Sequence, residues 1–251
     1  MGRPMLDVTI TATRRPKLVR QTLSSFDKFL FKGVRCRAII NVDPVGDDID
    51  SRRVVDVCQE FFDEVIYNLP EEASFPKAFK WVWSRATSDF VFHLEDDWEM
   101  LRPVYFRELL GLLVSHGNLA LLRLPAFHAG LEHMKTWNKF MPWNGEFYEV
   151  PPAQRIALGF CGHPSLIKGA FVRATSRFLD DSINPEKQFH HGPKELIQEV
   201  SRWRYGLIGE PADPPSKPIV QDIGRKWAVA NNWKKAGSKA FFTKWEKEHG
   251  K

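Results

Sequence analysis

The chain has 251 residues, enough to bury one substantial hydrophobic core, and its 43% hydrophobic and 27% charged residues are typical of a soluble globular protein. No apolar run approaches the roughly 20 residues that a membrane-spanning helix needs, and the first residues match neither a signal peptide nor a myristoylation site. The net charge of +5 permits a polyanionic partner without requiring one.

Strands and helices alternate along the first 125 residues. An alternating pattern or a short β-branched run marks each strand, and apolar residues three or four positions apart mark each helix. We expect strands at residues 6–13, 37–43, 65–67, 90–94 and 119–124, and helices at 16–30, 54–61, 76–86 and 106–113. Helices of this length between strands imply right-handed crossovers and a mainly parallel sheet. The predicted fold class is therefore α/β, with three layers.

The regular alternation ends near residue 125. Residues 134–160 are rich in aromatic side chains, which favours either the wall or lid of a ligand site or a satellite core packed on the sheet. A strand followed by the start of a helix is expected over 165–172, and a short helix over 194–203. Residues 180–193 are polar and turn-rich. Residues 210–218 hold four prolines, which indicates a linker or a wrapped arm.

Three consecutive carboxylates, Glu95, Asp96 and Asp97, follow the fourth predicted strand. Because residues two apart share a face of an extended chain, Glu95 and Asp97 can point together from the end of that strand. Open α/β sheets bind ligands beyond the carboxyl ends of their strands, and paired carboxylates suit Mg²⁺ or Mn²⁺. The other interpretation is that these acids begin the next helix, where negative charge is favourable.

The order of these segments resembles that of GT-A-type glycosyltransferases of the family-two kind. The stretch Thr11-Ala12-Thr13-Arg14-Arg15 resembles the opening segment that lines the nucleotide pocket, and Asp43 resembles the acid on the nucleotide side. Residues 73–79 resemble the segment that, in many members of the family, precedes the helix before the strand with the metal-binding acids. Glu95-Asp96-Asp97 stands where the family has its D-x-D motif. The resemblance covers the N-terminal half well and the C-terminal half loosely.

The resemblance implies a GT-A-like, Rossmann-type fold with an irregular acceptor-binding C-terminal half. Residues 1–125 would form the half that binds the nucleotide sugar, and residues 126–209 the acceptor-binding half of the same domain. Residues 210–251 would form a proline-rich arm and a basic, aromatic C-terminal segment.

The resemblance also implies a nucleotide-sugar donor, most often a UDP-sugar, and a Mn²⁺ or Mg²⁺ ion bridging its two phosphates. Asp97 is expected to bind the ion directly, Glu95 through water or as a second ligand, and Asp222 as a late ligand where many members have His. Asp96 is expected to reach sugar or ribose hydroxyls. The residues expected to bind the donor are Thr11, Thr13, Arg14, Asp43, Lys77, Asp96 and Arg225, with Arg15 a further candidate for a phosphate contact.

An inverting glycosyltransferase needs a carboxylate that takes the proton of the acceptor hydroxyl. In the family this acid lies near the start of a helix in the acceptor half. Glu186 is the first candidate, Asp181 the second and Glu195 the third. The alternative is that the acidic and polar residues of 180–187 serve only as turn and capping residues.

The tail from Arg225 to Lys251 has eight Lys or Arg residues against two Glu. The aromatic residues among them are Trp227, Trp233, Phe241, Phe242 and Trp245. We expect an amphipathic helix that packs these aromatics on the sheet and leaves a basic surface. Basic and aromatic side chains also occur together where proteins hold nucleic acid, which favours DNA as a partner.

The predicted acceptor is a hydroxymethylated base in DNA, as for some phage enzymes of this broad class. A saccharide or lipid-linked glycan acceptor is the alternative within the same chemistry. A non-enzymatic nucleic-acid-binding module is the alternative from a different class. Cys36, Cys58 and Cys161 are widely spaced with no C-x-x-C, so we expect reduced thiols and a cytoplasmic protein, in the host cytoplasm if phage-encoded.

Overall fold

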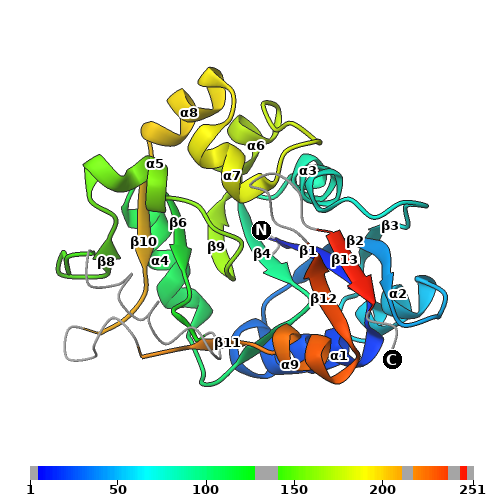
Figure 1. The fold of residues 1–251 in the computed structure, drawn as a ribbon. Coiled ribbons are helices and arrows are strands. Elements are labelled where there is room, and N and C mark those ends of the chain that lie inside the picture. Colours follow the sequence, from blue (N-terminus) through cyan, green and yellow to red (C-terminus); the bar gives the residue numbers. More distant parts are fainter. Residues whose placement is uncertain (1–4, 128–140, 211–216, 237–243, 248–251) are drawn as a thin grey trace.

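The computed structural model describes residues 5–127, 141–210, 217–236 and 244–247. Its centre is an eight-stranded sheet in the order β3-β2-β1-β4-β9-β6-β10-β8 (Figure 1). The strands are β1 Leu6–Arg14, β2 Cys36–Gly46, β3 Val65–Asn68, β4 Phe90–Glu95, β6 Leu119–Arg123, β8 Tyr148–Glu149, β9 Ser165–Lys168 and β10 Arg204–Leu207. Strands β3, β2, β1 and β4 are parallel neighbours, as are β6 and β10. The predicted mainly parallel α/β sheet is confirmed.

The two antiparallel members of this sheet come from the C-terminal half of the chain. β9 runs antiparallel to both β4 and β6, and β8 runs antiparallel to β10. β9 therefore separates two strands that are consecutive in the predicted N-terminal series. The sheet is continuous across residue 125, because β8, β9 and β10 extend the same hydrogen-bonded order.

Every helix predicted in the first 125 residues is present: α1 Pro16–Phe26, α2 Arg52–Gln59, α3 Phe75–Arg85 and α4 Phe106–Ser115. Pro16 begins α1, where its fixed φ suits the first turn. α1 runs into a short π-helix, η1 Asp27–Phe31. Ser74 caps α3, because its side-chain oxygen accepts a hydrogen bond from the backbone N–H of Lys77 at 3.4 Å.

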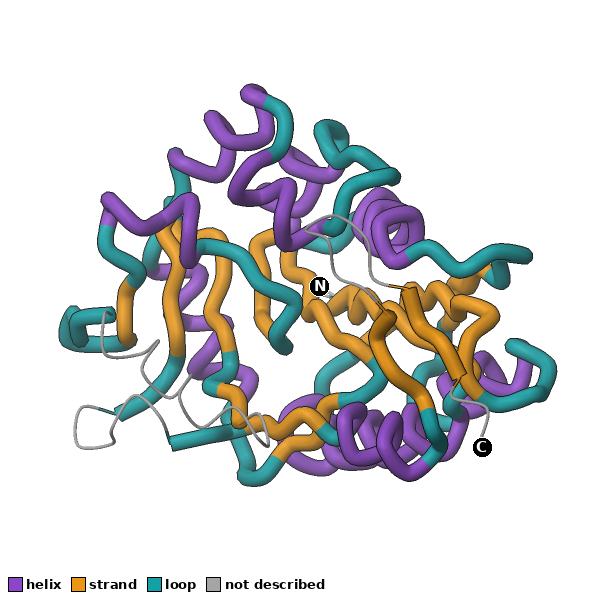
Figure 2. Tube along the Cα trace, viewed as in Figure 1, coloured by secondary structure: helices purple, strands orange, loops and turns teal. Residues whose placement is uncertain are grey.

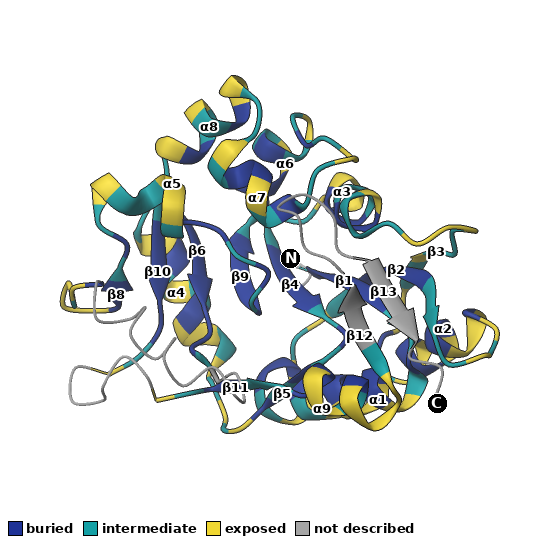
Figure 3. Ribbon diagram, in the orientation of Figure 1, coloured by how far each residue is buried: buried dark blue, intermediate teal, exposed yellow. Residues whose placement is uncertain are grey.

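The helices cover both faces of the sheet and give three layers. Apolar side chains of α1, α2 and α4 join one buried cluster on one face, and those of α3, α6, α7 and α8 join a second cluster on the other. Neighbouring residues of β2 divide between the two, since Ile40 belongs to the first cluster and Ile39 to the second. Figure 3 shows the strands largely buried, with exposed residues gathered on the outer helices.

The helices of the C-terminal half are η3 Pro152–Gln154, α5 Arg155–Leu158, α6 Gly169–Ser176, α7 Pro185–His191, α8 Lys194–Ser201 and α9 Gly224–Ala230. The strand and helix start expected over 165–172 are confirmed as β9 and α6, and the short helix after 194 as α8. The turn-rich stretch 180–193 contains the helix α7, whose N-cap is Asn184. The Asn184 side chain accepts hydrogen bonds from the backbone N–H groups of Glu186 and Lys187.

A second, three-stranded sheet returns the C-terminal segment to the end of β4. Its order is β5-β11-β7, with β5 Trp98–Met100, β7 Ala126–Phe127 and β11 Val220–Asp222. Figure 2 draws the strands of this sheet as short orange segments below the central sheet. The interpretation that a helix begins directly after the acidic triplet is wrong, because a turn leads from the triplet straight into β5. The extended conformation lets β5 pair with β11 in antiparallel fashion, with Asp222 opposite Trp98.

The basic tail is not the single amphipathic helix that the sequence predicts. After β11 it forms the short helix α9 and then a hairpin of β12 Trp233–Ala236 and β13 Lys244–Lys247. Asn231 and Asn232 end α9, and Asn232 has a φ of 58°, a conformation that asparagine tolerates better than most residues. Phe241 and Phe242 lie outside the described residues, as does the side chain of Trp245.

The aromatic segment 134–160 contributes to the two main cores where the structure describes it. Phe147 is buried in the first cluster, and Tyr148 and Phe160 are buried in the second. These three side chains are therefore part of the hydrophobic core and not of a lid over a ligand site. Trp137 and Phe140 lie outside the described residues. None of the helices in the described ranges combines the length and apolar character that a bilayer crossing requires.

Candidate functional site

Three neighbouring strands bring the predicted site residues to one edge of the sheet. β1 lies between β2 and β4 and runs parallel to both, so the carboxyl ends of all three strands share that edge. Thr13 of β1 stands opposite Asp43 of β2, and Thr11 stands opposite Glu95 of β4. Open α/β sheets bind their ligands beyond this edge.

Asp96 is the most enclosed of the three acids and is 3% exposed. Its Oδ2 accepts hydrogen bonds from the backbone N–H of Thr13 at 2.9 Å and from the Thr13 hydroxyl at 3.3 Å. Its backbone carbonyl accepts from the Thr22 hydroxyl at 2.8 Å. Asp96 therefore ties the turn after β4 to the end of β1 and the middle of α1.

Arg15 supplies the counter-charge for this turn. Its Nε donates to Asp96 Oδ2 at 3.2 Å, and its Nη2 pairs with both Asp96 Oδ1 and, at 3.2 Å, Asp97 Oδ2. The guanidinium carbon lies 5.1 Å from the centre of the Trp227 ring on α9. Burial by itself would lower the pKa of Arg15, but Asp96 and Asp97 raise it above its ordinary value, so the side chain stays charged.

Asp97 lies between Arg15 and the C-terminal segment. Its backbone carbonyl accepts from the N–H of Ile223 at 2.9 Å. A Cβ atom placed on Gly224 would lie 2.1 Å from Asp97 Oδ2, so only glycine fits at that position. Burial raises the pKa of Asp97 to about 6; Arg15 opposes this shift, and the charges of Asp96 and Asp222 add to it.

Asp222 reaches this site through the pairing of β11 with β5. Its Oδ1 accepts from the N–H of Gly224 at 2.9 Å and from that of Arg225 at 3.3 Å, the first two residues of α9. Its Oδ2 accepts from Arg225 Nε at 3.0 Å. The pairing of these two short strands places Asp222 opposite Trp98, the residue that follows Asp97. The role of Asp222 as a late metal ligand stays a prediction.

Glu95 faces a different side of the site, where it meets Glu186 across Gly162. The backbone N–H of Gly162 donates to Glu186 Oε1 at 2.7 Å. A Cβ atom on Gly162 would lie 2.8 Å from Glu95 Oε1 and 3.4 Å from Glu186 Oε1. Two carboxylates from β4 and from the first turn of α7 therefore converge on one glycine.

His163 follows this glycine and joins the two sides of the site. Its ring lies 5.2 Å from that of Trp98, the residue paired with Asp222. Burial lowers the pKa of His163 to about 4, Arg123 lowers it further, and the charges of Glu186 and Asp222 oppose the shift. The sequence marks His163 only as a polar surface or packed residue, because it lacks metal-ligand spacing with a partner.

Asp43 forms the third side of the site, at the end of β2. It is 8% exposed and accepts from Asn41 Nδ2 at 2.8 Å and from the backbone N–H of Ser74 at 3.0 Å. Burial raises the pKa of Asp43 to about 6, although these two hydrogen bonds oppose the shift. Asp43 thus connects the sheet edge to the N-terminus of α3.

Asp97 and Asp222 are the two carboxylates of this site that could serve as hard oxygen ligands for a divalent ion. Within the described part of the chain, no group of three or more His, Cys, Asp or Glu side chains is arranged to hold a metal. Mg²⁺ is commonly bound by one or two carboxylates together with substrate phosphates and water. The two carboxylates fit an ion held in that way, and Glu95 lies toward Gly162 rather than completing a protein-only site.

Comparison with solved structures identifies the fold. The crystal structure of S. aureus TarS matches 86% of this chain with a TM-score of 0.59 at 13% sequence identity. TarS 1–349 in complex with UDP-GlcNAc matches 84% of the chain with a TM-score of 0.55 at 12% identity, and its complex with UDP matches 81% with 0.53 at 11%. The fold is GT-A-like.

The chain spans 36% of the length of TarS and 60% of the length of the 1–349 fragment with UDP-GlcNAc. No protein-family model matches the chain. No curated protein matches it either. The likeness to TarS therefore concerns the fold alone.

Several residues predicted from sequence lie at the margin of this candidate site. Arg14 donates from Nε to the Ser51 hydroxyl at 2.9 Å, at the start of α2, whereas Arg15 enters the site. Lys77 is exposed in the first turn of α3, near the Ser74 that contacts Asp43. Asp181 is exposed, and among the described residues it makes no hydrogen bond or ion pair with the other candidates.

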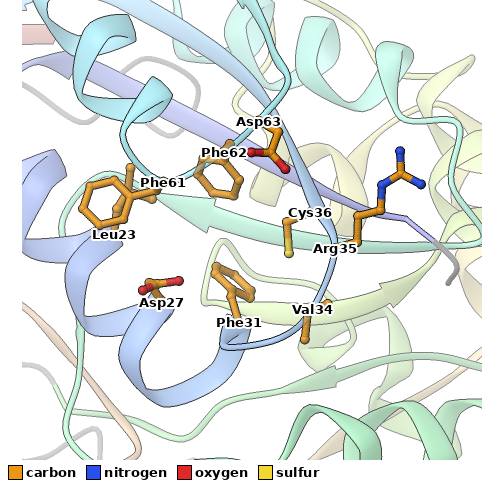
Figure 4. Close-up of a pocket in the computed structure, with 9 residues that line it drawn as sticks. All are labelled: Leu23, Asp27, Phe31, Val34, Arg35, Cys36, Phe61, Phe62 and Asp63. Atoms are coloured by element: carbon orange, nitrogen blue, oxygen red, sulfur yellow. The ribbon is translucent and has the colours of Figure 1, made fainter.

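A shallow pocket lies at the opposite, amino-terminal edge of the sheet (Figure 4). Cys36, the first residue of β2, lines it together with Leu23, Phe31 and the acids Asp27 and Asp63. Burial, with a contribution from Asp27, raises the pKa of Cys36 to about 12 and keeps the thiol protonated. The length of β2 separates this pocket from Asp43, so it takes no part in the site.

Proposed function

We propose that this chain is a glycosyltransferase that takes its sugar from a nucleotide-diphosphate donor. One observation carries the proposal: the carboxyl ends of β1, β2 and β4 bring Asp43 and the Asp96-Asp97 turn together at the ligand-binding edge of a GT-A-like sheet. The complexes of TarS 1–349 with UDP-GlcNAc and with UDP support a nucleotide sugar as the donor. We propose a UDP-sugar first.

The donor's nucleotide would lie over the ends of β1 and β2. Thr11, Thr13 and Asp43 line that part of the edge, and Lys77 stands at the start of α3 beside it. The diphosphate would lie toward Arg15 and Arg225, the two guanidiniums that flank Asp97 and Asp222. Planar guanidiniums suit phosphate oxygens because they can donate two parallel hydrogen bonds.

A Mn²⁺ or Mg²⁺ ion would be held by Asp97 and Asp222 together with donor oxygens. When bound, such an ion stabilises the negative charge that develops on a departing diphosphate. Asp96 orients the turn, since its carboxylate is engaged by Thr13 and Arg15. Glu95 would contribute to the site from beside Gly162, on the side that faces α7, and not as a direct ligand of the ion.

Glu186 is the carboxylate that we propose as the general base. Its Oε1 is fixed by the N–H of Gly162, and its place in the first turn of α7 sets it beside Glu95 at the edge of the donor site. A fixed carboxylate can accept the proton of an acceptor hydroxyl as the hydroxyl attacks the sugar. Asp181 is the weaker candidate because it lies in an exposed turn before the helix.

For the acceptor, a hydroxymethylated base in DNA stays a prediction from the sequence. Its basis is the basic tail, most of whose side chains lie outside the described residues. Labelled UDP-sugars incubated with hydroxymethylated and unmodified duplexes test it, and absence of transfer to both rejects this acceptor. If DNA binds but nucleotide sugars do not, a nucleic-acid-binding module replaces the enzyme; its affinity would fall steeply with salt.

Release of nucleoside diphosphate from a panel of nucleotide sugars tests the proposed activity. We expect release from at least one donor in the presence of Mn²⁺, and a loss on the order of a hundredfold in Asp97→Asn and in Asp222→Asn. Asp56→Asn, at an exposed ion pair with Arg52 on α2, is the control for removing a surface carboxylate. Equal release by wild type and both site variants would contradict the proposed roles.

A further inference from the structure

The cation that pairs with the Asp97 carboxylate is a side chain of the protein itself, that of Arg15. Arg15 is only 6% exposed, and its Nη2 pairs with Asp96 and, at 3.2 Å, with Asp97 Oδ2. On the other side of the same oxygen stands the backbone of Gly224, close enough to exclude a Cβ atom. The Asp97 oxygen that faces the C-terminal segment is therefore enclosed by a guanidinium and a glycine.

Trp227 keeps Arg15 in this position. Its ring centre lies 5.1 Å from the guanidinium carbon, within the range in which a cation is attracted to an indole face. Trp227 belongs to α9, and Asp222 accepts a hydrogen bond from the N–H of Gly224, the first residue of that helix. The contact with Arg15 therefore joins the end of β1 to the same short segment that supplies the second carboxylate.

Much of the charge around Asp97 is already neutralised by the protein itself. Asp96 and Asp97 pair with Arg15, and Asp222 pairs with Arg225. A divalent ion at Asp97 would therefore have to displace the guanidinium of Arg15. A bound diphosphate would add negative charge, attract the guanidiniums and restore the demand for a cation.

We infer that Arg15, held by Trp227, is the internal cation of this site and competes with the divalent ion for Asp97. Arg15 would release Asp97 for the ion once the diphosphate of a bound donor attracts its guanidinium. The inference rests on the proposed function, and it assigns Arg15 and Trp227 as positioning residues that couple ion binding to donor binding. Such coupling is reciprocal, so the ion strengthens donor binding by the same factor.

Mn²⁺ binding to the free protein tests the inference, measured by the loss of the free-ion electron paramagnetic resonance signal with and without UDP. In wild type we expect weak binding of Mn²⁺ alone and at least about a tenfold gain when UDP is present. In Arg15→Gln we expect Mn²⁺ alone to bind about tenfold more tightly, with a smaller gain from UDP. Arg20→Gln, which removes an exposed arginine of α1 paired with Glu60, is the matched control and should behave as wild type.

Trp227→Ala provides a second variant in case Arg15→Gln does not fold, because it leaves every charge of the site in place. It should tighten Mn²⁺ binding to the donor-free protein in the same direction, and Trp227→Phe should restore the wild-type affinity. Donor-free Mn²⁺ affinity that is unchanged or weaker in both Arg15→Gln and Trp227→Ala would overturn the inference. If wild type binds UDP, that result leaves the proposed function standing; if wild type binds neither UDP nor a nucleotide sugar, the proposed function itself fails.

Discussion

Gly224 and Asp97 lie in such close contact that a Cβ atom on residue 224 would stand 2.1 Å from the Asp97 carboxylate. The contact sets the distance between the turn after β4 and the start of α9. It also explains why the chain needs a glycine directly after Ile223, whose N–H donates to the Asp97 carbonyl. The carboxyl-end edge of the sheet and the C-terminal segment are therefore packed tightly against each other at Asp97 and Gly224.

Gly224→Ala should separate these two segments. We expect a loss of about 1–3 kcal/mol in the free energy of unfolding, the usual range for forced overpacking, together with weaker nucleotide binding. Gly111→Ala is the control, because a Cβ atom there meets nothing within 4 Å in the middle of α4. That substitution should raise stability by about 0.5–1 kcal/mol. Equal urea midpoints for the two variants would show that the contact is not tight.

Glu186→Gln should lower the rate of sugar transfer while donor binding is retained. A general base contributes about 10²–10⁴-fold, so we expect a loss of at least a hundredfold in kcat with little change in the KM of the donor. Glu108→Gln, in the first turn of α4, controls for removing an acid near a helix N-terminus. A larger loss in Asp181→Asn than in Glu186→Gln would transfer the role to Asp181.

The titration of Asp43 should make the free energy of unfolding depend on pH. Its pKa in the folded protein, about 6, lies above the ordinary value of 3.8, so the folded state holds this proton more tightly than the unfolded state. The stabilisation by protonated Asp43 is present below pH 4 and is lost as the pH rises through 6. Relative to Asp43→Asn, wild type should lose up to about 3 kcal/mol between pH 4 and pH 7. A flat difference between the two urea-unfolding free energies over that range would contradict the shift.

Trp83 should be the costliest aromatic of α3 to remove. It is fully buried and its ring contacts those of Phe79, Phe160, Phe171 and Phe189. Trp83→Ala should destabilise the fold by about 3–5 kcal/mol. Trp81→Ala, on the partly exposed side of the same helix, should cost clearly less. Similar losses from both would mean that α3 does not bury the face the structure assigns to it.

Local patterns predict the first half of this fold because each pattern matches its environment. The alternation in β1 and the apolar spacing of Val19, Leu23 and Phe26 in α1 are set by burial against one layer. The position of β9 between β4 and β6 was not predictable in this way, because pairing partners far apart in the sequence leave no local periodicity. The same holds for β5 and β11, whose pairing joins residues 98 and 222.

The residues of the candidate site are predictable from sequence where they lie at strand ends. They are not predictable where a side chain has several polar partners within reach. Asp43, Thr13 and the acidic triplet follow from the parallel order of β1, β2 and β4. The sequence offers both Arg14 and Arg15 for a phosphate contact and does not separate them, because the pairing of β1 with β2 shifts register between Thr13 and Arg14, where a period of two no longer holds. In the structure Arg15 contacts Asp96, and Arg14 contacts Ser51. Glu95 lies toward Gly162, which belongs to a loop from another part of the chain. The sequence of the acidic triplet therefore does not predict where Glu95 lies.

Isothermal titration of nucleotide sugars into the protein, with and without Mn²⁺, tests the central proposal most directly. We predict that at least one UDP-sugar binds, that Mn²⁺ strengthens its binding by about tenfold or more, and that Asp97→Asn abolishes this gain while Asp56→Asn keeps it. Absence of binding for every nucleotide sugar tried, with Mn²⁺ present and the protein folded, would contradict the assignment of this sheet edge as a donor site.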